Sequence, residues 1–271
     1  MKRTAATTLA AVVALAVLAA GPVLAAEGNA KAPANTVKLL DEALKLVGPA
    51  KDMPKELILK EGDSVVCLGD SITAGGGYLR YMDCFFAQQC PDLKIKKVIN
   101  AGVSGHKAEN MIARFEKDVV KRKPNVVTIN VGINDVWHRV GKPHDPEVLA
   151  KYKENVGKMI DQAQAAGIKV VLLAATVIEE NPESEGNKRL PLYVNAMKEL
   201  AAEKKCGFVD LHQMFLDALK HKPADMKGNW LTGDGVHMKP LGYAVMTVAA
   251  LRGLGAGDEK IAATEIPGRS R

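Results

Sequence analysis

The chain has 271 residues, of which 47% are hydrophobic, 25% charged and only 4% aromatic, which is typical of a globular protein with one sizeable core. The formal charge of +6 is mild, and the basic residues are scattered among acidic ones. No block of lysines and arginines alternates with aromatic residues, so the composition argues against a nucleic-acid-binding protein.

The first 26 residues have the pattern of a secretory signal peptide. Lys2 and Arg3 make a basic start, an uncharged apolar stretch runs from Leu9 to Ala20, and small residues follow at a possible cleavage point. The alternative is an uncleaved membrane anchor, but the apolar stretch is short and interrupted for that role. We therefore expect a secreted or periplasmic protein with residues 1–26 removed and no stable membrane insertion afterwards.

The rest of the chain alternates apolar runs with amphipathic segments. Residues 27–56 are expected to form a linker and an N-terminal helix, the helix over Thr36–Val47. The expected strands of the main domain, residues 57–256, are Ser64–Leu68, Ile95–Ile99, Val126–Val131, Lys169–Ala174 and Phe208–Leu211. The expected helices are Tyr78–Gln89, Ala108–Val120, Pro146–Ala166, Leu190–Lys204 and Leu241–Leu254. This alternation predicts a single α/β domain with a five-stranded parallel sheet and helices on both faces. Residues 257–271 carry no periodicity and are expected to form a loose tail.

Three successive strand ends carry candidate functional residues. Ser71 follows the first strand, the stretch Asn100–Gly105 follows the second, and Gly132–Asp135 follows the third. Ligands of parallel α/β sheets bind outside the carboxyl ends of the strands. Near the other end of the chain, His237 offers a general base and Asp234 a carboxylate to orient it. With a serine nucleophile they make the minimum set for acyl transfer.

Each of these stretches alone is also compatible with an ordinary turn or helix cap. Their joint occurrence, in this order and at these strand ends, favours a catalytic site.

Four stretches resemble the sequence blocks of the SGNH hydrolases, also called the GDSL esterase/lipase family, and the resemblance covers roughly Asp63 to Leu254. The blocks are Gly69–Thr73, Asn100–Gly105, Gly132–Asp135 and Asp234–His237. The resemblance implies a three-layer α/β/α, flavodoxin-like SGNH hydrolase fold.

The same resemblance implies a role for each candidate residue. Ser71 would be the nucleophile, His237 its general base, and Asp234 the group that holds the imidazole. The backbone N–H groups of Ser71 and Gly102, with the side-chain amide of Asn134, would form the oxyanion hole. Asp70 is expected to hold the turn and not to act in catalysis.

The sequence therefore predicts an exported serine esterase that hydrolyses short-chain acyl esters, O-acetyl groups on carbohydrates above all, through an acyl-enzyme. The alternatives are a lysophospholipase or thioesterase, an acyltransferase, or a non-catalytic glycan-binding module of the same fold. Trp137 and Trp230 flank the expected site, where they suit a sugar ring or an acyl chain, or simply pack. The expected partner is a small-molecule or glycan ester and not a nucleic acid.

We expect no cofactor and no metal, because no histidines, cysteines and carboxylates have the spacing of a metal site. Cys84 and Cys90 are the only close cysteine pair, and either a disulfide or two reduced thiols fits their spacing. Cys67 and Cys206 are expected to be core thiols.

Overall fold

A five-stranded parallel sheet forms the centre of the protein. The structure, a computed structural model, describes residues 36–49, 53–96 and 98–268, so the expected signal peptide and the linker residues 27–35 lie outside the described part. The strands are β2 (Val65–Gly69), β3 (Ile99–Gly102), β4 (Val126–Asn130), β5 (Lys169–Leu173) and β6 (Gly207–Val209). Their order is β3-β2-β4-β5-β6 and every pairing is parallel, which confirms the expected sheet and the flavodoxin-like strand order.

The strand order predicts a ligand-binding crevice at the carboxyl ends of β2 and β4. The connection after β2 leads to β3 on one side of it, whereas the connection after β4 leads to β5 on the other side, so these two connections diverge. Ligands of doubly wound sheets bind at such a point. All five residues of β4 are buried, as expected for a Val/Ile-rich strand covered on both faces.

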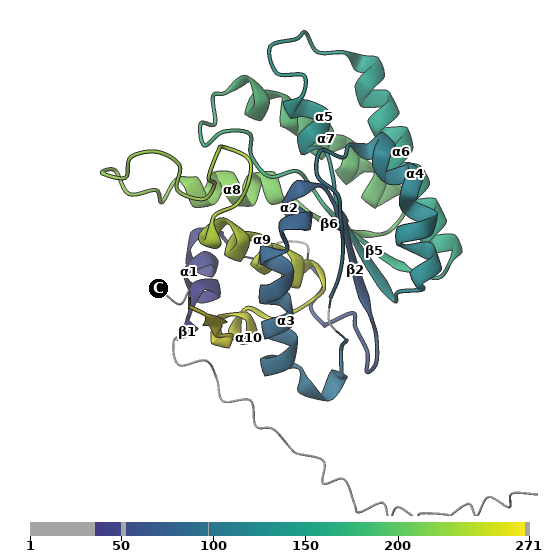
Figure 1. Cartoon of the computed structure of the whole chain (residues 1–271), viewed down its shortest axis with the longest axis vertical. Helices are drawn as coiled ribbons and strands as arrows, with labels where there is room; N and C mark the ends of the chain where they lie inside the picture. The colour runs from purple at the N-terminus through teal and green to yellow at the C-terminus, as the bar shows by residue number, and fades with distance from the viewer. Residues whose placement is uncertain (1–35, 50–52, 97, 269–271) are drawn as a thin grey trace, which may run out of the picture. The chain divides into compact units, whose positions relative to one another are not determined.

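Helices cover both faces of the sheet (Figure 1), which confirms the three-layer α/β/α architecture. One layer holds α1 (Leu39–Leu46), α3 (Gly77–Gln89), α8 (Leu211–Leu219), α9 (Pro240–Gly253) and α10 (Asp258–Ala263). The other holds α4 (Ala108–Asp118), α6 (Pro146–Ala165) and α7 (Glu185–Glu203). Helix α9 is apolar around most of its circumference because it packs against α1, α3 and α8 as well as the sheet.

The second strand lies later in the sequence than expected. The prediction was Ile95–Ile99, whereas β3 runs from Ile99 to Gly102. Its pairing with β2 begins at Ile99, opposite Val66, and the preceding residues follow a 3₁₀ turn that ends at Lys94 with φ 48°. The stretch Asn100–Gly105 therefore begins inside the sheet, next to the strand that leads to Ser71.

The chain after Gly255 is more ordered than expected. Helix α10 follows, and β7 (Ile266–Pro267) pairs antiparallel with β1 (Thr36–Val37). The buried guanidinium of Arg252 donates to both carboxylate oxygens of Asp258 at 2.8 Å and so fixes the start of this segment. The expectation of a loose tail is wrong for residues 258–267.

All four cysteines are free, so the structure favours reduced Cys84 and Cys90 over a disulfide. Burial raises the pKa of the Cys67 thiol to about 12, as suits a core residue.

In the part of the chain that the structure describes, no helix is long and apolar enough to cross a membrane. Two short helices that were not expected, α2 (Ser71–Gly75) and α5 (Ile133–Trp137), follow β2 and β4 at the crevice.

Candidate active site

Ser71 lies at the first position of α2, immediately after the turn that ends β2. Asp70 caps this short helix, because its Oδ1 accepts the N–H of Ile72 at 2.9 Å. Gly69 has no room for a side chain, since a Cβ there would overlap the hydroxyl of Thr73. The backbone N–H of Ser71 has no acceptor among the described residues. The turn thus holds both the hydroxyl and the N–H of Ser71 at the edge of the sheet.

The structure brings Ser71, His237 and Asp234 into one hydrogen-bonded line. Ser71 Oγ lies 2.8 Å from His237 Nε2, and His237 Nδ1 lies 2.7 Å from Asp234 Oδ2. These partners assign the proton to Nδ1, so that Nε2 accepts from the serine hydroxyl. Such a line can draw a proton from Ser71 while Asp234 steadies the resulting imidazolium.

Asp234 is also fixed from its other oxygen. Oδ1 accepts the backbone N–H of Val236 at 3.0 Å and that of His237 at 2.8 Å. Burial works against the charged carboxylate, but these hydrogen bonds and the imidazole outweigh it and lower the pKa of Asp234 to about 2. Asp234 is therefore ionised throughout the neutral range, as an orienting carboxylate must be.

Asn134 is the second residue of α5, and it is buried. Its Nδ2 donates one hydrogen to the carbonyl oxygen of His106 at 3.1 Å. An amide nitrogen carries two hydrogens, so the other is available to an acceptor in the crevice. Gly132 precedes the helix with φ 120°, a backbone conformation that side chains rarely adopt, and so directs α5 across the strand end.

Gly102 lies beside the short helix that begins at Ser71, but its N–H already donates a hydrogen bond. It donates to Oδ1 of Asn100 at 2.9 Å, and the Asn100 amide in turn donates to the Thr73 carbonyl at 2.9 Å. A Cβ on Gly102 would overlap the backbone nitrogen of Ala74, so packing alone demands a glycine there. Gly105, on the same loop, is exposed, has φ 77° and has an N–H without an acceptor among the described residues.

Arg114, which the sequence did not single out, ties the strand ends around the crevice together. Its guanidinium donates to the carbonyls of Gly69 at 2.9 Å and Ala101 at 2.8 Å, and to His106 Nδ1 at 3.0 Å. Burial and the nearby arginine lower the pKa of His106. The only sequence signal for Arg114 is its spacing of four residues from Asp118, which indicates an ordinary helical ion pair. That ion pair forms at 2.8 Å.

The two tryptophans differ in how closely they approach this line of residues. The ring of Trp137 lies 6.1 Å from that of His237, nearly edge-on at 77°, and the residue is 37% exposed. Trp230 is partly buried and packs against the hydrophobic core. Trp137 therefore forms part of the wall beside His237, and the packing interpretation applies to Trp230.

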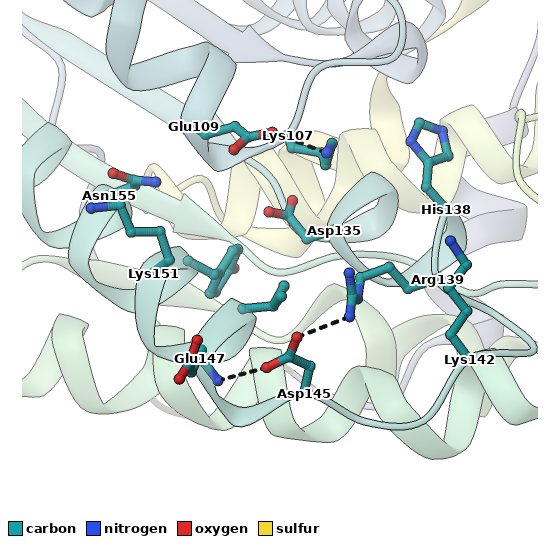
Figure 2. Close-up of a pocket in the computed structure, with 12 residues that line it drawn as sticks. Lys107, Glu109, Asp135, His138, Arg139, Lys142, Asp145, Glu147, Lys151 and Asn155 are labelled. Carbon is teal, nitrogen blue, oxygen red and sulfur yellow. Dashed lines mark hydrogen bonds and ion pairs between the residues drawn. The ribbon is translucent and has the colours of Figure 1, made fainter.

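A cavity of about 610 Å³ opens beside α5 (Figure 2). None of Ser71, Asp234 and His237 lines it, but Asp135 and His138 do, and these follow Asn134 and Trp137 in sequence. Most of its lining is charged or polar: Lys107, Glu109, Asp135, His138, Arg139, Lys142, Asp145, Glu147, Lys151 and Asn155. The cavity is therefore lined mainly by groups that can form hydrogen bonds and ion pairs.

No group of three histidine, cysteine, aspartate or glutamate side chains within the described ranges could hold a metal ion.

A model of the GDSL-like Lipase/Acylhydrolase family matches residues 67–245. The chain belongs to this family. The acetylxylan esterase of Geobacillus stearothermophilus is 29% identical over 213 residues, which are 72% of this chain and 94% of that protein. An arylesterase of Vibrio mimicus is 28% identical over 183 residues, 66% of this chain and 81% of that protein.

The crystal structure of the Geobacillus acetylxylan esterase is similar with a TM-score of 0.66 and 28% identity, over 74% of this chain and 97% of that one. Together with the family match, this likeness makes the chain a carboxylic ester hydrolase of the SGNH type. In this esterase the candidate residues Ser71, Gly102 and Asn134 lie at the carboxyl ends of β2, β3 and β4. The loop before α9 brings Asp234 and His237 to Ser71.

Proposed function

We propose that this esterase hydrolyses short-chain acyl esters, O-acetyl groups on carbohydrates above all, through an acyl-enzyme on Ser71. The observation that carries the proposal is the line from Ser71 through His237 to Asp234, with contacts of 2.8 and 2.7 Å. Solved structures of the Geobacillus esterase include catalytic mutants of a serine, an aspartate and a histidine, the last two three positions apart as Asp234 and His237 are. That correspondence supports the same roles in this chain.

The proposed reaction has two halves. Ser71 Oγ attacks the acyl carbon while His237 Nε2 takes the hydroxyl proton, and collapse of the tetrahedral intermediate transfers that proton to the departing alcohol. His237 then takes a proton from water, the hydroxide attacks the acyl-enzyme, and a second collapse returns the proton to Ser71 and releases the acid. Asp234 stabilises the imidazolium in both halves.

The oxyanion hole of this proposal consists of the Ser71 N–H, the second hydrogen of the Asn134 amide and an N–H from the glycine loop. Gly102, the residue expected from the sequence, contributes only if it shares its N–H with Asn100 Oδ1. Donors of this kind stabilise charge that exists in the transition state and not in the substrate.

The proposed carbohydrate specificity rests on the surroundings of the Ser71–His237–Asp234 line. The partly exposed Trp137 ring beside His237 provides a flat face of the kind on which sugars stack, and the charged cavity beside α5 offers hydrogen-bonding groups. The acetylxylan esterase relative supports the same substrate class. We also propose export, on the signal-peptide pattern of residues 1–26.

The decisive experiment is the Ser71→Ala variant. Hydrolysis of p-nitrophenyl acetate should fall on the order of 10⁶-fold in kcat, because the nucleophile is gone. The melting temperature should stay close to that of the parent protein, since a strand-end hydroxyl contributes little to stability. Retained hydrolysis in a purified, folded Ser71→Ala preparation would show that the reaction takes another route.

A further inference from the structure

The segment that carries Asp234 and His237 has little regular structure of its own. It is closed by the single bridge between Thr232 and Met238, with the Gly233 N–H donating to the His237 carbonyl at 2.7 Å. The Lys239 N–H donates to the Leu231 carbonyl at 2.8 Å. Residues 234–237 therefore form the tip of a small closed loop, and their position depends on how residues 230–232 at its base are held.

Glu180 holds that base. Its Oε1 accepts the backbone N–H groups of Leu231 at 2.7 Å and Thr232 at 2.6 Å, together with the Thr232 hydroxyl at 2.9 Å. Its Oε2 accepts the backbone N–H of Trp230 at 2.5 Å. One carboxylate thus satisfies three consecutive backbone donors, and its side chain is only 2% exposed.

Glu180 is itself held in place from helix α7. Asn187 accepts the Ile178 N–H at 2.9 Å and donates to the Glu179 carbonyl at 3.2 Å and the Asn181 carbonyl at 2.7 Å, so its side chain brackets Glu180 in sequence. The Glu179 N–H also donates to the Gly235 carbonyl at 2.7 Å, at the tip of the loop. The connection therefore runs from α7 through residues 178–181 to both base and tip of the loop.

Burying the charged carboxylate of Glu180 costs free energy, which its contacts must offset. A buried carboxylate is unfavourable unless hydrogen bonds or a cation compensate for the lost water. Here the donors are four, and the Lys222 ammonium lies 3.8 Å away. Hydrogen bonds to an ionised acceptor are shorter and stronger than those to a neutral one, so the carboxylate fixes the loop more tightly than an amide would.

We infer that Glu180 is a positioning residue for catalysis, which keeps His237 in register with Ser71 by fixing the base of the Asp234–His237 loop. The inference rests on the proposed triad. Glu180 touches neither Ser71 nor His237, and it acts through residues 230–232. Its loss lets the loop shift, which lengthens the Ser71–His237 contact without removing any reacting group.

Two substitutions separate positioning from simple stabilisation of the fold. Glu180→Ala removes all four acceptor contacts. Glu180→Gln has nearly the same volume and keeps an oxygen for Leu231 and Thr232, but it turns an NH₂ group toward the Trp230 N–H. Glu183→Gln is the matched control, because Glu183 lies in the same segment with a 79% exposed side chain paired only to Lys188.

For folded protein, we expect Glu180→Ala to lower kcat for p-nitrophenyl acetate about 10²-fold, the loss that a displacement of about 1 Å can cause, with a much smaller change in KM. Glu180→Gln should recover part of that loss, and Glu183→Gln should match the parent protein. In proton NMR spectra, the downfield resonance of His237 Nδ1–H should weaken or move in both Glu180 variants and not in the control.

Parent-like kcat and an unchanged Nδ1–H resonance in Glu180→Gln would overturn the inference, and this variant serves even if Glu180→Ala does not fold. A loss that follows only the folded fraction, with normal kcat per folded molecule, would overturn it too. Failure of the triad itself gives a different result. Hydrolysis would then survive Ser71→Ala, while the NMR resonance still reports whether Glu180 holds the Asp234–His237 pair.

Discussion

Replacing Asp135 by asparagine should stabilise the protein at alkaline relative to acidic pH. Asp135 is 6% exposed, and its carboxyl group accepts the Ala108 N–H at 3.3 and 3.4 Å from its two oxygens. Burial therefore raises its pKa from an ordinary value of 3.8 to about 7. Because the folded protein holds this proton more tightly than the unfolded chain does, the contribution to stability is full below pH 3.8 and is lost as the pH rises through 7.

The size of the effect follows from the two pKa values. At pH 5 the folded protein keeps the proton while the unfolded chain has released it, and at pH 8 both states have released it. The free energy of unfolding of the parent protein should therefore lose about 2–3 kcal/mol from this group between pH 5 and pH 8. That corresponds to about 5–10 °C in melting temperature for a domain of this size. Asparagine fills the same space and has no proton to lose.

The assay is denaturant unfolding of parent and Asp135→Asn at pH 5 and pH 8. The difference in free energy of unfolding between the two proteins should move in favour of the variant by about 2–3 kcal/mol across this range. Glu147→Gln is the control, because Glu147 is an exposed carboxylate that lines the same cavity, and its difference should stay nearly constant. A difference for Asp135→Asn that does not change with pH would refute the reasoning.

Three further predictions concern activity. Asn134→Ala should lower kcat about 10²–10³-fold with little change in KM, because its amide is proposed to donate to charge that exists only in the transition state. An effect on KM alone would assign Asn134 to substrate binding. The pH profile of kcat/KM should fall toward acid with one ionisation, since protonated His237 cannot accept the Ser71 proton while Asp234, with a pKa of about 2, stays ionised; a flat profile would contradict this. Across p-nitrophenyl esters, kcat/KM should peak at acetyl or propionyl. A buried CH₂ gains about 0.8 kcal/mol only against apolar groups, and the cavity beside α5, the helix that carries Asn134, is lined mainly by charged and polar residues. A rise up to octanoyl would favour a lysophospholipase or thioesterase.

Two of the proposed catalytic residues could be predicted because they lie at strand ends. Ser71 and Asn134 directly follow apolar runs whose strand character is strong, so their shared edge of the sheet could be worked out. Asp234 and His237 could be predicted from their spacing and from the resemblance of their sequence block. Boundaries were harder: β3 begins four residues after the expected start, because its pairing with β2 decides where it lies and periodicity alone cannot.

The supporting residues were not predictable for a different reason. Glu180 belongs to an acidic, proline-containing stretch that has the composition of an exposed loop, and its partners lie 50 to 52 residues further along. Arg114 has an ordinary helical ion-pair spacing, yet it reaches the carbonyl of Gly69, 45 residues away. Contacts between a side chain and distant backbone leave no periodic signal, so only the folded chain reveals them.

The pairing of β1 with β7 has a consequence for how this chain could be rebuilt. Thr36 lies opposite Pro267 and Val37 opposite Ile266, so the two ends of the described chain are neighbours. A short glycine-rich linker could join them, and new ends could be opened at an exposed turn such as the one at Gly141, which has φ 80° and where an added Cβ would meet no atom within 4 Å. The resulting circular permutant would keep every strand pairing of the sheet while its chain began between Asn134 and Asp234.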